Sequence, residues 1–182
     1  MIPAAGGRPI QFTDDPAQDS QPAWSPDGSS IVFASDRGGA TRIWIAPVSE
    51  GRPAGPPRPL TGDTMSVGAP VFSSDGNAVI YIGDTDDGPD VWMVPADGSA
   101  AGRRITSGAQ ASMVRDDGAT GSLFVCGTWK EGEISIRRVS LTGQVVAPID
   151  PPIEFGPMTT LATFDASSEG ADRHSDLPRA PT

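Results

Sequence analysis

The densest group of chemically capable side chains lies in an acidic turn near the middle of the chain. Four carboxylates, Asp84, Asp86, Asp87 and Asp90, fall within seven residues, and Gly88 lets the backbone turn among them. Carboxylate oxygens at this density could hold a Ca²⁺ ion. Their order departs from the D-x-[DN]-x-[DN]-G pattern of calcium loops, however, and turns favour the same residue types without a ligand. We therefore favour a solvated hairpin turn and keep a Ca²⁺ site as the alternative.

Other reactive residue types occur singly. Cys126 ends an apolar run, whereas a reactive thiol needs exposure and a nearby cation or base, so we predict core packing. His174, the only histidine, stands in a polar stretch that offers no ordered partner for base or metal chemistry. Ser25 and Ser35 have no histidine in a hydrolase arrangement. The sequence therefore predicts no catalytic residue, no cofactor-binding residue and no metal ligand.

The tryptophans fall into two groups. Trp24, Trp44 and Trp92 recur at related positions of an internal repeat, which predicts packing between repeats and not a ligand platform. Trp129 differs because it stands in the turn Gly127–Gly132, which has no counterpart elsewhere. An aromatic side chain at a loop tip can anchor a partner. Packing over a sheet edge is nevertheless the interpretation we favour for Trp129.

The internal repeat organises the whole chain. Residues 21–35, QPAWSPDGSSIVFAS, return without a gap 48 positions later as residues 69–83, APVFSSDGNAVIYIG. Each copy places an Asp-Gly turn between two short strands, the second of which is apolar at almost every position and so is expected to be buried on both faces. The matched positions include Trp24 with Phe72, Phe33 with Tyr81, Asp36 with Asp84, Trp44 with Trp92 and Pro47 with Pro95.

A third copy is weaker but legible. Its turn is Asp117–Gly118, Val114 is aligned with the aromatic residue before the turn, and Arg137 is aligned with Trp44 and Trp92. Four short strands in each repeat of about 40–48 residues predict blades of a β-propeller. The predicted fold class is therefore all-β, a partial β-propeller of four-stranded antiparallel blades, with about three blades and incomplete blades at both ends.

The predicted boundaries follow from the repeat. We predict a partial blade at residues 1–13, blades at residues 20–61, 68–106 and 111–150, and at residues 151–182 the weak start of a further blade with a disordered tail. Such a chain cannot close a ring alone, so we expect a fragment of a propeller. Unpaired blade edges invite pairing with another chain, which predicts self-association.

The amino-acid composition limits the classes of partner that we expect for the chain. The formal net charge is −10, which repels phosphate backbones and argues against nucleic acid as a partner. No apolar run is long enough to span a membrane, and one cysteine cannot form an internal disulfide. The first residues lack the charged and apolar regions of a signal peptide, so the compartment is left open.

The run PAWSPDGSSIVFASDR at residues 22–37, followed by Ile43 and Trp44, resembles the PD40, or WD40-like, repeat of TolB-like β-propellers. The resemblance extends over residues 1 to about 150 and implies a bacterial protein, with a periplasmic or cell-envelope location suggested by the family. It implies a protein-interaction scaffold without catalytic activity of its own, whose protein partner is unknown. The alternative is the propeller portion of a larger enzyme or sensor: a prolyl-oligopeptidase-like peptidase, or a bacterial regulator with a winged-helix or kinase domain.

Overall fold

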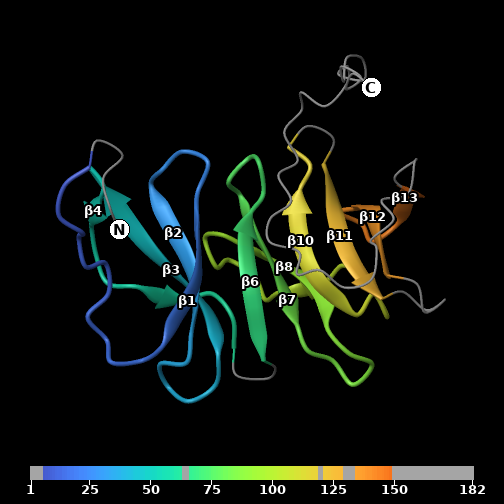
Figure 1. Ribbon diagram of the computed structural model, residues 1–182, viewed down its shortest axis with the longest axis horizontal. Coiled ribbons are helices and arrows are strands. Elements are labelled where there is room, and N and C mark those ends of the chain that lie inside the picture. The colour runs from blue at the N-terminus through green and yellow to red at the C-terminus, as the bar shows by residue number, and fades with distance from the viewer. Residues whose placement is uncertain (1–5, 63–65, 119–120, 129–133, 149–182) are drawn as a thin grey trace, which may run out of the picture.

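The computed structural model describes residues 6–62, 66–118, 121–128 and 134–148. All regular elements in these ranges are β-strands, and they form three antiparallel sheets that stand side by side along the chain (Figure 1). The predicted all-β fold of antiparallel, four-stranded propeller blades is therefore confirmed. Within the described part of the chain, no helix has the length and apolar character needed to cross a membrane.

We call the three sheets blades 1, 2 and 3. Blade 1 contains β1 (Asp19–Trp24), β2 (Ser30–Ser35) and β3 (Arg42–Ser49), and both β4 (Arg52–Pro53) and β5 (Arg58–Pro59) pair with β3. Blade 2 contains β6 (Val67–Phe72), β7 (Ala78–Gly83), β8 (Asp90–Pro95) and β9 (Arg103–Arg104), in that order. Blade 3 contains β10 (Ala111–Asp116), β11 (Ser122–Thr128), β12 (Ile134–Ser140) and β13 (Val145–Pro148), also in chain order.

Incomplete blades were expected at the two ends of the chain. Residues 6–18, which include most of the expected partial blade, form no strand, although Phe12 packs against the apolar cluster of blade 1. Residues 149–182 lie outside the described ranges, and with them the expected start of a further blade.

The strand register repeats from blade to blade and corrects one sequence alignment. In the first hairpin of each blade, Trp24 pairs with Ile31, Phe72 with Val79, and Asp116 with Leu123. The next residue closes the turn in the same way each time, because its N–H donates to the carbonyl of the residue that opens the second strand. Asp116, and not Val114, therefore occupies the position of Trp24 and Phe72. The alignment failed because the third turn differs in sequence from the first two.

The first two turns share one hydrogen-bonding scheme. In blade 1 the Ser25 hydroxyl donates to Asp27 Oδ1 (2.6 Å) and accepts from the Ser30 N–H (2.9 Å). In blade 2 Ser73 makes the same two bonds with Asp75 (2.6 Å) and Ala78 (3.0 Å). In the turn of blade 1, Gly28 follows Asp27 and has a φ of 72°, a left-handed backbone conformation that glycine adopts without strain.

The core lies between the blades. One cluster joins β2 and β3 of blade 1 to the near face of blade 2, and a second joins β7 and β8 to blade 3. The buried members of the first cluster are Val32, Ala34, Ile43, Ile45, Val67, Phe72, Val79, Tyr81 and Val94. Those of the second are Ile80, Val91, Ile105, Ala109, Ala111, Val114, Leu123, Val125 and Val139. Because β7 contributes to both clusters, both of its faces are covered, which explains its uninterrupted apolar sequence.

Each of the two blade junctions also has one hydrogen bond from an arginine, and the two arginines occupy equivalent positions. Arg58 pairs opposite Ile45 and donates from Nη2 to the carbonyl of Ala96 in blade 2 (2.9 Å). Arg103 pairs opposite Met93 and donates to the carbonyl of Leu141 in blade 3 (2.8 Å). The two junctions are thus built alike, from an apolar face and an arginine at the outer strand.

Candidate functional site

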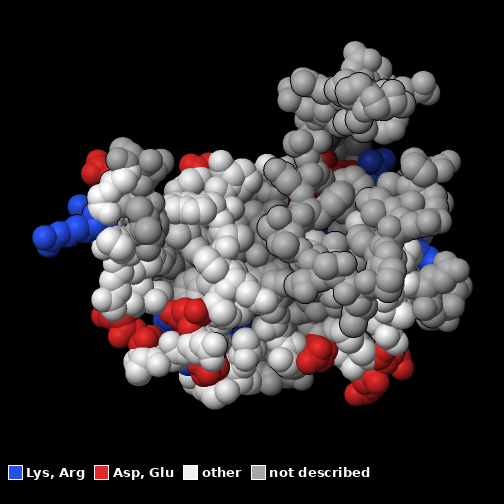
Figure 2. All heavy atoms as spheres, viewed as in Figure 1, with Lys and Arg blue, Asp and Glu red and all other residues white. Residues whose placement is uncertain are grey.

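The carboxylates of the acidic turn do not converge on one point. Asp84, Asp86 and Asp87 are exposed in the β7–β8 hairpin, whereas Asp90 opens β8 and is fully buried. Acidic side chains gather along the lower edge of the space-filling view, the edge at which this hairpin turns (Figure 2). Among the residues that the structure describes, no group of three or more His, Cys, Asp or Glu side chains could hold a metal ion.

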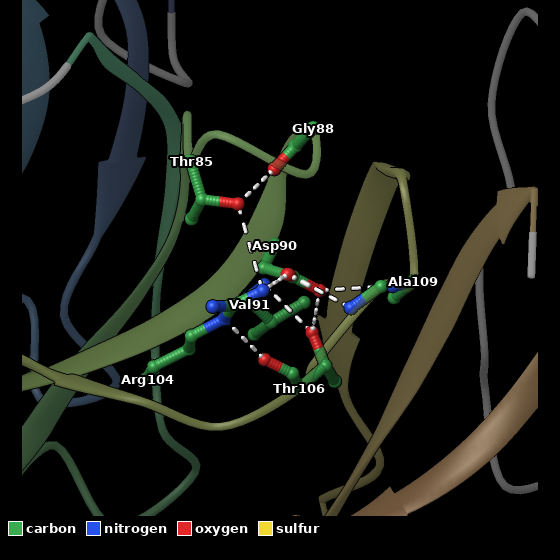
Figure 3. A network of polar contacts seen from close by, with 8 residues as sticks. Thr85, Gly88, Asp90, Val91, Arg104, Thr106 and Ala109 are labelled. Carbon is green, nitrogen blue, oxygen red and sulfur yellow. Dashed lines mark hydrogen bonds and ion pairs between the residues drawn. The ribbon is translucent and has the colours of Figure 1, made fainter.

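Asp90 is instead the centre of a buried polar network (Figure 3). Its Oδ1 accepts hydrogen bonds from the Thr106 hydroxyl (2.7 Å) and the Ala109 N–H (3.0 Å). Its Oδ2 accepts from the Gly108 N–H (3.0 Å) and from Arg104 Nη2, which also makes this contact an ion pair. Both oxygens of Asp90 are therefore occupied by donors from this chain.

The network joins one blade to the next. Asp90 belongs to β8, whereas Gly108 and Ala109 lie in the connection that leads into β10 of blade 3. Thr106 adds a further link, because its hydroxyl oxygen accepts the N–H of Val91 (3.0 Å). Thr61 accepts the N–H of Ile43 in the same manner in blade 1 (3.0 Å). The carboxylate of Asp90 thus fixes the path of the chain between blades 2 and 3.

The hydrogen bonds also control the charge of Asp90. Burial by itself would raise the pKa of this carboxyl group, since desolvation penalises the charged form. The donors from Thr106, Ala109, Arg104 and Gly108 outweigh burial and hold the pKa of Asp90 below its ordinary value. The carboxyl group of Asp90 is accordingly ionised at neutral pH. Its role is structural, because its oxygens already accept hydrogen bonds from this chain.

A second ion pair lies in blade 1. Arg37 Nη2 donates to Asp19 Oδ2 (2.7 Å), and the guanidinium group lies 5.2 Å from the ring centre of Phe33 and 4.9 Å from that of Trp44. Burial would raise the pKa of Asp19, but hydrogen bonds from Ser35, Arg37 and Thr13 hold it below its ordinary value. Arg37 is therefore held over two aromatic rings, a favourable cation–π arrangement.

Beside this ion pair, the face of blade 1 that points away from blade 2 is hollowed. We call the depression the Trp24 hollow; its volume is about 310 Å³. It is lined by Phe12, Thr13, Asp19, Ser20, Pro22, Trp24, Ile31 and Phe33. Aromatic and aliphatic atoms make up most of this lining, and Trp24 retains 47% of its surface exposed to solvent.

The sequence analysis expected Trp24, Trp44 and Trp92 to pack between repeats, and the structure places the three side chains in different surroundings. Trp92 packs between blades 1 and 2, as expected for a repeat position. Trp44 packs with Phe12 over the apolar cluster of blade 1. The expectation was wrong for Trp24, because no blade in the described structure covers the face on which it stands. Trp129, the loop-tip candidate, lies outside the described residues.

The remaining candidates are placed as follows. Cys126 is buried in β11 with 4% of its surface exposed, as predicted for a packing residue. Ser25 and Ser35 are buried and hydrogen-bonded within blade 1, Ser25 to Asp27 and Ser35 to Arg37. His174 lies outside the described residues. Sequence reasoning missed the network of Asp90, although one signal was present: in the repeat alignment its counterpart is Arg42, so the charge at this position reverses between blades.

Comparison with known proteins gives similarities of structure only. No family model matches the chain, and no curated protein matches it. Among solved structures, a putative TolB from Agrobacterium tumefaciens is 21% identical and superposes with a TM-score of 0.63, over 79% of this chain and 53% of that one. TolB from Acinetobacter baumannii is 16% identical with a TM-score of 0.52, over 70% and 32% of the two chains.

Two peptidase structures are also similar. A mutant puromycin hydrolase is 18% identical with a TM-score of 0.60, over 75% of this chain and 23% of that one. A Mycobacterium tuberculosis puromycin-hydrolyzing peptidase is 18% identical with a TM-score of 0.54, over 74% and 22% of the two chains. The fold is therefore that of TolB-like β-propellers and of the propeller domains of such peptidases. This chain spans about half the length of the first of these structures and less of the others.

Proposed function

We propose that the chain serves as a protein-interaction scaffold, a TolB-like propeller arc without catalytic activity of its own. One observation carries this proposal: the buried or partly buried carboxylates that could do acid–base or metal chemistry are engaged in bonds that hold the fold. Asp90 accepts four donors and Asp19 accepts Arg37. Asp27 and Asp75 are exposed, and they too are engaged, in the hydrogen bonds that brace two equivalent turns. Such bonding supports a rigid framework, which is what a surface that presents itself to a partner requires.

The second candidate function is the propeller portion of a larger enzyme. The structural similarity to the puromycin hydrolase and to the puromycin-hydrolyzing peptidase favours it over the regulator with a winged-helix or kinase domain. In this case the chain would cover only a minor share of the enzyme, since it covers 23% and 22% of these two proteins.

Site-specific photo-cross-linking in the host cell tests the scaffold. A photoreactive residue is introduced at exposed hairpin positions, one at a time, in place of Ser74 of the β6–β7 turn or Asp86 of the β7–β8 turn. A scaffold gives a discrete adduct with one partner protein from one edge of the blades. The purified chain is assayed in parallel with aminoacyl amide substrates. Turnover by the chain, with no adduct from either position, would reject the scaffold in favour of the enzyme.

A further inference from the structure

Five Asp-Gly bonds occur in the chain, and all of them lie in turns between strands. They are Asp27–Gly28, Asp75–Gly76, Asp87–Gly88, Asp97–Gly98 and Asp117–Gly118. In such a dipeptide the backbone nitrogen of glycine can attack the aspartate side chain, because glycine has no Cβ to hinder the approach. The attack requires a carboxyl group that is free to turn toward this nitrogen.

The glycine nitrogens of the five bonds are all engaged. Gly28, Gly76, Gly88 and Gly98 each donate their N–H to the carbonyl of the residue three positions earlier. Gly118 donates to a side-chain oxygen of the preceding turn residue (2.8 Å). All five glycines also have a positive φ. A difference in reactivity must therefore come from the carboxyl groups.

Two of the carboxylates are fixed by hydrogen bonds at both oxygens. Asp27 accepts the hydroxyl of Ser25 at Oδ1 (2.6 Å) and that of Ser29 at Oδ2 (2.7 Å). Asp75 is held in the same way by its own turn residues. Hydrogen bonds to the charged form lower the pKa of both carboxyl groups, so the protonated form, which loses water most readily, is rare.

Two further carboxylates are also held. Asp97 accepts the N–H of Ser99 (2.9 Å), and hydrogen bonds from Ser99 lower its pKa. Asp117 accepts the hydroxyl of Ser122 and lies 3.7 Å from Arg138 Nε, with only 2% of its side chain exposed. Each of these carboxyl groups must break hydrogen bonds before it can turn toward the next backbone nitrogen.

Asp87 is different from the other four. Its side chain is exposed, and no donor in the described part of the chain is bonded to its carboxylate. The turn is closed instead by Thr85, whose hydroxyl donates to the carbonyl of Gly88 (2.6 Å) and leaves Asp87 unengaged. We propose that Asp87–Gly88 is a modification site, the bond at which this protein forms isoaspartate.

The rearrangement needs only water. The Gly88 nitrogen forms a bond to Cγ of Asp87 and gives its proton to solvent, while a carboxyl oxygen takes up protons from solvent and leaves as water. The product is a cyclic succinimide. Water then adds to the main-chain carbonyl carbon of Asp87 and breaks its bond to nitrogen, so that the chain continues through the side chain and the former main-chain carbonyl becomes a carboxylate. The added backbone methylene lengthens the hairpin that leads into Asp90, whether or not the chain is a scaffold.

Incubation of the full chain at neutral pH, below its melting temperature, tests the proposal. Peptides from an acid digest are analysed by electron-transfer mass spectrometry, which distinguishes the isoaspartyl linkage. In the folded chain we expect several times more isoaspartate at Asp87 than at any other Asp-Gly bond. In urea the five bonds should react at similar rates, because the hydrogen bonds that protect four of them are lost. The proposal is overturned if Asp87 does not lead in the folded chain, or if it leads by the same margin in urea.

Matched variants test the cause of the selectivity. Replacing Ser25 and Ser29 together by alanine releases Asp27, and isoaspartate at Asp27 should rise several-fold while that at Asp75 stays unchanged. Ser29→Ala alone is used if the double variant does not fold. Asp87→Glu should abolish the modification of the β7–β8 hairpin, because the longer side chain would have to close a less favourable six-membered ring. No rise at Asp27 in a folded serine variant would overturn the proposal, since hydrogen bonding would then not select the site.

Discussion

Asp27 and Asp75 occupy the same position in consecutive blades and make the same bonds. Each carboxylate accepts a hydroxyl from the serine two residues earlier and a backbone N–H two residues later. Hydrogen bonds to the charged form favour it, so the bonds from Ser25 and Ser29 lower the pKa of Asp27 to about 2. The two turns owe their shape to one serine–aspartate pair each.

The first prediction concerns this pair. Replacing Ser25 by alanine removes the hydrogen bond that contributes most to the shift, and the pKa of Asp27 should then rise toward its ordinary value of 3.8. A pH titration of the carboxyl ¹³C shifts by NMR measures this directly. The pKa of Asp75 serves as the internal control and should not move, because Ser73 is intact. An unchanged pKa of Asp27 would contradict the assigned role of Ser25.

The second prediction concerns Asp90. Replacing Asp90 by asparagine keeps its size but leaves Arg104 and the amides of Gly108 and Ala109 with a poorer acceptor. We expect the free energy of unfolding to fall by about 2–4 kcal/mol, as for a broken buried charge pair. Urea denaturation followed by circular dichroism measures the loss. The control is D86N in the exposed hairpin, which should change stability by less than about 0.5 kcal/mol.

The same residue predicts an acid dependence. The folded-state pKa of Asp90 lies below its ordinary value of 3.8, so the unfolded chain binds more protons in acid. The stabilisation from Asp90 is therefore complete above about pH 4 and is lost as the pH falls through the folded-state pKa. Denaturation midpoints measured between neutral pH and pH 3 should fall less steeply for D90N than for the wild type. Parallel curves would show that Asp90 does not carry this dependence.

The burial of side chains on a strand of this protein depends on whether a neighbouring blade packs against that strand. β1 and β6 have the same register, yet Trp24 is half exposed and Phe72 is buried. The hydrophobic effect stabilises an aromatic side chain in proportion to the surface that is removed from water. Equivalent aromatic residues in consecutive blades should therefore contribute unequally to stability.

The third prediction tests this inequality. Truncation of a buried aromatic side chain to alanine costs about 3–5 kcal/mol, and we expect Phe72→Ala to fall in this range. Trp24→Ala should cost only about 1 kcal/mol, because the hollow leaves much of its surface in water. The two variants are compared by urea denaturation under identical conditions. Equal losses would mean that Trp24 is covered in solution.

At the scale of the whole molecule, the three described blades form a series in which blades 1 and 3 each pack against blade 2. Blade 2 is covered on both faces by the two apolar clusters, whereas blades 1 and 3 each share one of these clusters. In such arrays stability is close to a sum of intrinsic and nearest-neighbour terms. The central blade should therefore be the most stable part of the structure.

Hydrogen exchange supplies the fourth prediction. We expect amides of β7 and β8 to exchange most slowly, and those of β2 and β3 to exchange faster, because local opening is easier where fewer apolar contacts must break. D90N should speed exchange in β10 and β11 more than in β2 and β3, because it weakens the junction between blades 2 and 3. Mass spectrometry of peptic fragments resolves these segments. Equal acceleration in all three blades would show that Asp90 stabilises the molecule as one unit.

The strands, the turns and the propeller class could be predicted from the sequence because their determinants are local. Ser25 and Asp27 lie within one turn, and the apolar run of β2 marks a strand buried on both faces wherever it occurs. The repeat then extended this local pattern from one blade to the next. Only the weakest turn, which ends β10, misled the alignment, since Asp116 and not Val114 stands opposite Leu123.

The environment of individual side chains was decided by the tertiary structure. In the sequence, Asp90 is one of four acidic residues in a turn. Its structural role depends on donors that lie beyond β8 in the chain, namely Arg104, Thr106 and the backbone amides of Gly108 and Ala109. Trp24 and Phe72 have equivalent sequence contexts, and only the presence or absence of a neighbouring blade separates a core residue from an exposed one. Local sequence determines backbone conformation, whereas burial and charge depend on segments that are distant in the chain.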